Sequence, residues 1–167
     1  MALFSSIAMM IVCGIAIAGI EEHIGMAVAE LDPVGVVLGT AGNDIPDANS
    51  IVELCHKYGF KKIRISDDNS KLMYALMNQN IAVTLDIRNF KLPALADDND
   101  DQEISKWVRY NVKPYIGKIQ FEYIVVSDEA IPGPFSEYVA KVIKNLYNKL
   151  LEEDLEIKVT RRSPLRF

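Results

Sequence analysis

The chain has 167 residues, about the length of one domain, and half of them are apolar. A quarter of the residues are charged and the net charge is −5, which is ordinary globular composition. No block of Lys or Arg stands out, so the composition argues against a nucleic-acid partner.

The first twenty residues carry no charged side chain. Ala27-Val28-Ala29 follows and fits the small-x-small rule of secretory cleavage, so we predict a signal peptide over residues 1–29, although its start lacks the usual Lys or Arg. Ala16-Ile17-Ala18 is a second possible cleavage site. A signal anchor is the alternative, because about 18 apolar residues can span a bilayer. With cleavage, residues 30–167 would be secreted and free of the membrane.

From residue 33 onward, short apolar runs alternate with helical patterns. Strands are predicted at 34–38, 62–66, 81–87, 121–126 and 157–160. Helices are predicted over 48–58 and 135–151, and two more around the apolar sets Leu72, Met73, Leu76, Met77 and Ile104, Trp107, Val108, Val112. Residues 88–101 are expected to form a polar loop. Cys55 and Trp107 are predicted to be core residues.

This alternation indicates a parallel sheet with helices outside it. Two architectures fit, a doubly wound open sheet and a (β/α)8 barrel. The first βα loop, residues 39–43, does not give G-x-G-x-x-G, which weakens a dinucleotide-binding interpretation. A full barrel needs about 250 residues, so in a barrel this chain would stop just past half.

A carboxyl pair, Asp128 and Glu129, follows the fourth predicted strand directly and precedes a Pro/Gly turn. Functional groups in parallel α/β architectures lie at the carboxyl ends of strands. A carboxyl group kept partly dry there has a raised pKa and can donate a proton. Acidic residues in such loops also serve as helix caps, so both interpretations stay open on the residues alone.

Five segments in one order, spanning about residues 33–160, carry a resemblance. They are VGVVLG with NDIP (34–39 and 43–46), KIRISD (62–67), WVRYNVKPY (107–115), YIVVSDE (123–129) and the helix at 135–150. Together they resemble plant glycoside hydrolase family 17, the β-1,3-glucanases and their relatives. Several independent motifs in one order are more specific than any one of them.

The resemblance implies a secreted retaining glycosidase of the cell wall or vacuole that needs no metal or cofactor. It implies a (β/α)8 barrel, of which this chain would hold the first four βα units and the start of the fifth strand. The substrate would be β-1,3-glucan, hydrolysed at internal bonds, and the acid/base falls on Glu129.

Retaining chemistry needs a second carboxylate about 5 Å from the acid/base. In the family this nucleophile lies at the end of the seventh strand, so we expect it to be absent from these 167 residues. A half-barrel also leaves strand edges open, and a partner would be needed to complete it.

The substrate-side positions implied by the family are Asp128, Ser66, Leu38, Asn43 and Arg64. Asp128 stands where the family has Asn, and Leu38 and Ser66 stand where it has Tyr, whereas Asn43 and Arg64 match. Arg64 would orient carboxylates at the strand ends or form a structural ion pair. The absence of the nucleophile predicts that the chain is inactive in this form, and the three departures suggest relaxed selection or an incorrect gene boundary. The alternative is a non-catalytic glucan-binding or decoy remnant, or a mis-bounded gene fragment.

Overall fold

The computed structural model describes residues 34–39, 45–67, 69–97, 101–126 and 133–161. The predicted signal segment lies outside these ranges, as do Asn43, Asp128 and Glu129. Within the described ranges, no helix is long and apolar enough to cross a bilayer.

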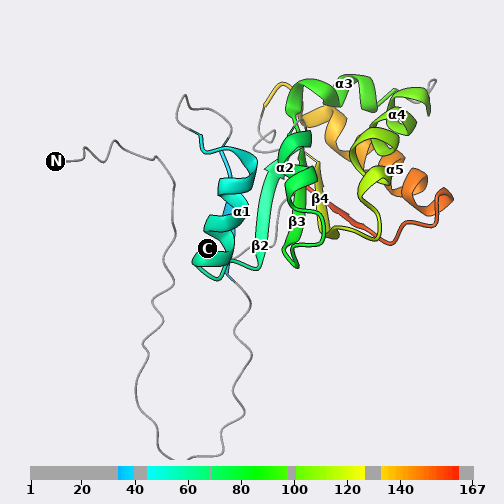
Figure 1. Ribbon diagram of the computed structural model, residues 1–167. Helices are drawn as coiled ribbons and strands as arrows, with labels where there is room; N and C mark the ends of the chain where they lie inside the picture. The colour runs from blue at the N-terminus through cyan, green and yellow to red at the C-terminus, as the bar shows by residue number, and fades with distance from the viewer. Residues whose placement is uncertain (1–33, 40–44, 68, 98–100, 127–132, 162–167) are drawn as a thin grey trace, which may run out of the picture.

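Strands and helices alternate along the described chain (Figure 1). In order they are β1 (Gly35–Val37), α1 (Ala48–Lys57), β2 (Lys62–Ser66), α2 (Ser70–Ala75), β3 (Ala82–Ile87), η1 (Asn89–Lys91), α3 (Leu92–Leu95), α4 (Asp101–Asn111), η2 (Lys113–Tyr115), β4 (Gln120–Val126), α5 (Ser136–Glu152) and β5 (Lys158–Thr160). All the predicted strands and helices are confirmed, with ends that differ by a few residues.

The prediction of a polar loop over 88–101 was wrong in its first half. Residues 89–95 form the 3-10 helix η1 and the short helix α3. Leu92 and Leu95 are both buried, and Pro93 occupies the first turn of α3, where its missing N–H costs nothing. A helix of four residues is too short to show a 3.6-residue period in the sequence, so the pattern could not indicate it.

The strand order decides between the two architectures. The five strands form one parallel sheet in the order β1-β2-β3-β4-β5, so each strand pairs with the next one along the chain. A doubly wound sheet reverses its direction at a switch point, and this sheet does not. Because βα crossovers are right-handed, steps that all go one way place all the helices on one side. The fold is therefore an arc of five successive strands of a (β/α)8 barrel.

The sheet has two chemically different faces. Residues paired across parallel strands point to the same face, and successive residues point to opposite faces. On the helix side the strands present fully buried apolar side chains, which are Ile63, Ile65, Val83, Leu85 and Ile124. The opposite face, which would line the inside of a barrel, carries Lys62, Arg64, Ser66, Thr84 and Asp86 together with the apolar Ala82 and Val125.

The helices cover the apolar face in two groups. Helices α1 and α2 contact each other, and α3, α4 and α5 pack together at the upper right of Figure 1. Trp107 of α4 and Cys55 of α1 are 5% and 2% exposed, which confirms both as core residues. Burial raises the pKa of the Cys55 thiol and so disfavours its reactive thiolate.

Local signals set the ends of α1. The Asp47 carboxylate accepts hydrogen bonds from the backbone N–H groups of Asn49 and Ser50 and from the Ser50 hydroxyl. These bonds, the hydroxyl one foremost, lower the pKa of Asp47. At the other end Gly59 adopts φ +72°, a left-handed conformation that glycine reaches without a Cβ penalty. These two signals fix the length of α1, the helix that connects β1 to β2, and so place β2 beside β1.

The buried face generates a stability prediction. Leu85 is 1% exposed between β2 and β4, so Leu85→Ala should lower the free energy of unfolding by about 2–5 kcal/mol through lost transfer energy and a residual cavity. Leu151→Ala, at a site 69% exposed, should change it by less than about 0.5 kcal/mol. Chemical denaturation of both variants measures this, and equal losses would contradict the assignment of the helix side as the core.

A second prediction concerns pH. Glu153, just after α5, lies 2.5 Å from the Lys113 ammonium of η2 and 3.5 Å from that of Lys149, and the Lys113 hydrogen bond lowers the Glu153 pKa. Because the pKa of Glu153 is lower in the folded state, its ionised carboxylate stabilises the fold at pH values above the ordinary pKa of 4.5. This stabilisation is lost as the pH falls through the lowered pKa. Glu153→Gln should therefore lower the melting temperature slightly at neutral pH and leave it unchanged near pH 2. Thermal melts across this range test it, and a difference that grows as the pH falls would refute it.

Candidate active site

A charged pair joins β2 and β3 near their carboxyl ends, on the face away from the helices. The Arg64 Nε–H is shared between the two oxygens of Asp86, at 2.9 Å from Oδ1 and 2.7 Å from Oδ2. The two side chains are 11% and 12% exposed. At this burial the pair is held in one geometry, because separating it would leave a charge without its counterion in a poorly solvated place.

The sequence left two interpretations of Arg64 open, a residue that orients carboxylates and a member of a structural ion pair. The structure shows Arg64 in an ion pair with Asp86, a residue that the sequence analysis did not single out. A signal was present, because Thr84 and Asp86 are polar residues at alternate positions of an otherwise apolar strand. That spacing predicts one polar and one apolar face, whereas the segment as a whole had been interpreted only as a strand.

A second ion pair lies nearer the amino ends of the strands. Lys62 Nζ contacts Glu122 Oε1 at 2.6 Å, and both side chains are about four-fifths buried. The register between β3 and β4 shifts between Val83 and Thr84, which inserts Glu122 as an extra residue in β4. The bulge is the local reason that a carboxylate reaches this face opposite Lys62.

The predicted substrate-side residues are placed differently from one another. Ser66 is half-buried, shares the polar face with Arg64 and stands in register with Asp86. Leu38 follows β1, where its N–H donates to the Arg64 carbonyl at 3.0 Å and its side chain packs against the apolar core. Asn43, Asp128 and Glu129 lie outside the described residues, so their roles stay predictions.

Asp67, the last residue of the KIRISD segment, is a further buried carboxylate. It turns to the helix side, where its Oδ2 accepts hydrogen bonds from Trp107 Nε1 at 2.7 Å and Lys91 Nζ at 2.8 Å. Its own N–H donates to the Asp86 carbonyl at 2.8 Å. One residue thus ties the end of β2 to β3, η1 and α4, and this holds the rim on which Arg64 and Ser66 sit.

Comparisons with known proteins agree with this architecture. The family model of glycosyl hydrolases family 17 matches residues 34–166. A glucan endo-1,3-beta-glucosidase of Vitis vinifera is 31% identical over 130 residues, which are 75% of this chain and 37% of that protein. Glucan endo-1,3-beta-glucosidase A of Solanum lycopersicum is 30% identical over 131 residues, 76% of this chain and 38% of the relative.

A solved structure shows the same likeness in three dimensions. CJP38, a beta-1,3-glucanase and allergen of Cryptomeria japonica pollen, superposes on this chain with a TM-score of 0.72 and 30% sequence identity. The superposed part covers 77% of this chain and 41% of the CJP38 chain. The fold places the protein in the (β/α)-barrel class. Within that class, the chain belongs to glycosyl hydrolases family 17. It spans about two fifths of the length of the relatives it matches.

The buried pair generates a prediction about coupling. Arg64→Met and Asp86→Asn should each lower the free energy of unfolding by about 3 kcal/mol, because each leaves a largely buried charge without this counterion. The double variant should lose clearly less than the sum of the two. Lys106→Met, in the exposed pair with Glu103, is the matched control and should cost less than about 1 kcal/mol. Denaturant melts of the four variants give the coupling energy, and additive losses would contradict it.

Proposed function

We propose that this chain carries the proton-donating half of a retaining β-1,3-glucanase site, with Glu129 as the acid/base. The observation that carries the proposal is the family match over residues 34–166, which includes Glu129. The relatives named above are glucan endo-1,3-beta-glucosidases. Glu129 comes three residues after the end of β4, and barrel enzymes place catalytic residues after strand carboxyl ends.

The retaining mechanism assigns a role to each carboxyl group. The acid/base protonates the oxygen of the leaving sugar while a second carboxylate, about 5–5.5 Å away, attacks the anomeric carbon, and water then releases the glycosyl group. The second carboxylate would lie beyond these 167 residues, as the family resemblance implies. Residues 1–167 acting alone would therefore bind the β-1,3-glucan without cleaving it.

The polar strand face would contribute the near side of the sugar-binding cleft. The Asp86 carboxylate fixes the Arg64 guanidinium through Nε, and this ordering suits a group that positions carboxyl and hydroxyl oxygens. Ser66, on the same face, offers a small hydroxyl where the family has a tyrosine ring. The cleft would hold the sugar by hydrogen bonds with less aromatic stacking than the family uses.

Binding without hydrolysis is the second candidate function. It is favoured by Leu38, which packs into the core and offers no ring or hydroxyl where the family has Tyr. In both cases we propose that residues 1–29 direct the protein into the secretory route, toward the wall or the vacuole, where its polysaccharide would be met.

The test is a laminarin hydrolysis assay on the 167-residue chain and on the same chain fused to the second half of the Vitis vinifera relative. The chain alone should release no reducing sugar. The fusion should be active, and Glu129→Gln should lower its kcat by about 10²- to 10⁴-fold, because proton donation to the leaving group is lost.

Glu53→Gln, an exposed carboxyl on α1, is the matched control and should leave the rate of the fusion unchanged. An active fusion that is indifferent to Glu129→Gln would overturn the acid/base assignment. Turnover by the 167-residue chain that depends on Glu129 would instead overturn the proposal that the second carboxylate lies elsewhere.

A further inference from the structure

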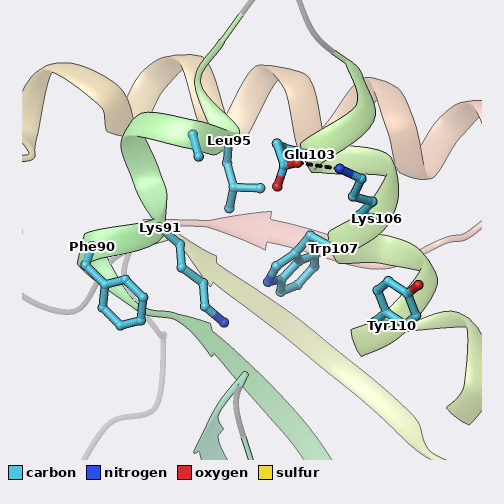
Figure 2. Close-up of a pocket in the computed structure, with 8 residues that line it drawn as sticks. Phe90, Lys91, Leu95, Glu103, Lys106, Trp107 and Tyr110 are labelled. Carbon is cyan, nitrogen blue, oxygen red and sulfur yellow. Dashed lines mark hydrogen bonds and ion pairs between the residues drawn. The ribbon is translucent and has the colours of Figure 1, made fainter.

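A groove runs over the outer helical layer, on the side of the sheet away from Arg64 and Ser66. It has a volume of about 490 Å³, which is within the range of small-molecule binding sites. The side chains that line it come from η1, α3 and α4 and include Phe90, Lys91, Leu95, Glu103, Trp107 and Tyr110 (Figure 2). Trp107 and Leu95 belong to the core, but neither the core nor the proposed catalytic role explains why the exposed rings of Phe90 and Tyr110 lie beside them.

The floor of the groove is held in place from below. Trp107 Nε1 and Lys91 Nζ both bind the fully buried carboxylate of Asp67, at 2.7 Å and 2.8 Å. Because one buried acceptor fixes both side chains, the indole and the lysine stem keep their positions without a ligand. A preformed floor lowers the ordering cost of binding.

Two exposed rings flank that floor. Phe90 and Tyr110 are 65% and 67% exposed, and Figure 2 shows them on opposite sides of Lys91 and Trp107. Exposed aromatic rings around a concave apolar surface are a mark of a binding site. Rings in this position can stack on the flat apolar face of a ligand, and the Tyr110 hydroxyl can donate or accept a hydrogen bond.

The charges that line the groove are paired within the protein. Lys91 is matched by Asp67, and Lys106 Nζ contacts Glu103 Oε1 at 2.7 Å (Figure 2). A phosphate or another anion would have to compete with these carboxylates for the lysines. A neutral ligand with apolar faces and hydroxyl edges fits better, because it can stack on the rings while Glu103 and Lys106 bond to its hydroxyls.

We propose that this groove is a second carbohydrate site, which binds a short run of glucose units of a β-1,3-glucan chain away from the strand-end cleft. The choice of this sugar rests on the proposed function, whereas the site itself rests on the groove geometry. Its purpose would be to hold the polysaccharide on the protein while another part of the same chain occupies the cleft. When one polysaccharide chain binds at the groove, the linked part of the same chain reaches the cleft at a higher effective concentration.

Trp107 is the sole tryptophan of the sequence, so intrinsic fluorescence reports directly on the groove. Titration of the 167-residue chain with laminarihexaose should change the Trp107 emission saturably. Phe90→Ala and Tyr110→Ala should each weaken this binding by about fivefold or more, because each removes a stacking surface. Tyr110→Leu, which keeps an apolar side chain without a ring, should behave like Tyr110→Ala.

Tyr147→Ala, at an exposed tyrosine of α5, is the matched control and should leave the affinity unchanged. The Phe90, Tyr110 and Tyr147 variants replace exposed side chains, and circular dichroism melts test that each variant folds. Glu129→Gln should also leave the fluorescence response intact, which separates this site from the proposed catalytic one.

Three other outcomes would each overturn either the groove site or the proposed function. Calorimetric binding of laminarihexaose with no change in Trp107 emission, and with no effect of Phe90→Ala, would overturn the groove site and leave the proposed function standing. A fluorescence response to the hydrophobic dye ANS but none to the hexasaccharide would also overturn it and mark the groove as an apolar protein-docking surface. A saturable response together with an inactive fusion enzyme would support the groove site while the proposed function fails.

Discussion

Every described strand of this protein has to satisfy two environments at once, and the rest of the structure depends on that constraint. Side chains alternate across a strand, so one set meets the helices and the other meets the concave side of the arc. Ile63 and Ile65 bury their side chains beneath the helices, while Lys62 and Arg64 point the other way. Burial of the apolar set holds the helices on one side, and this arrangement requires each strand to be added next to the previous one.

The concave side holds charged residues beside apolar ones such as Val125, in a place where barrels of this class commonly stack branched apolar residues. It does so with pairs, since an unpaired charge at this depth would be costly. Lys62 is matched by Glu122 through a bulge in β4, and Arg64 is matched by Asp86 across the strand boundary. A surface already organised around carboxylates and cations is compatible with the proposed role of Glu129 as a proton donor.

The end of β2 connects the two sides of the sheet. Arg64 and Ser66 face the concave side, and Asp67, the next residue, turns to the helices and binds Trp107 and Lys91. The proposed cleft and the proposed outer groove are thus built on adjacent residues of one strand end. Asp67 is also bonded through its N–H to the Asp86 carbonyl, so the same strand end joins the neighbouring strand.

Local patterns in the sequence determined the strands and the longer helices, the Asp47 cap, the turn at Gly59 and the burial of Trp107, because periodicity and turn chemistry act within a few residues. The ordered motifs also indicated the family and pointed to Arg64. Strand order, and with it the choice of a barrel arc over an open sheet, came only from tertiary structure, as did the Arg64–Asp86 and Asp67–Trp107 contacts. These join residues 22 and 40 positions apart, and no local pattern specifies which distant side chain will complete a buried charge.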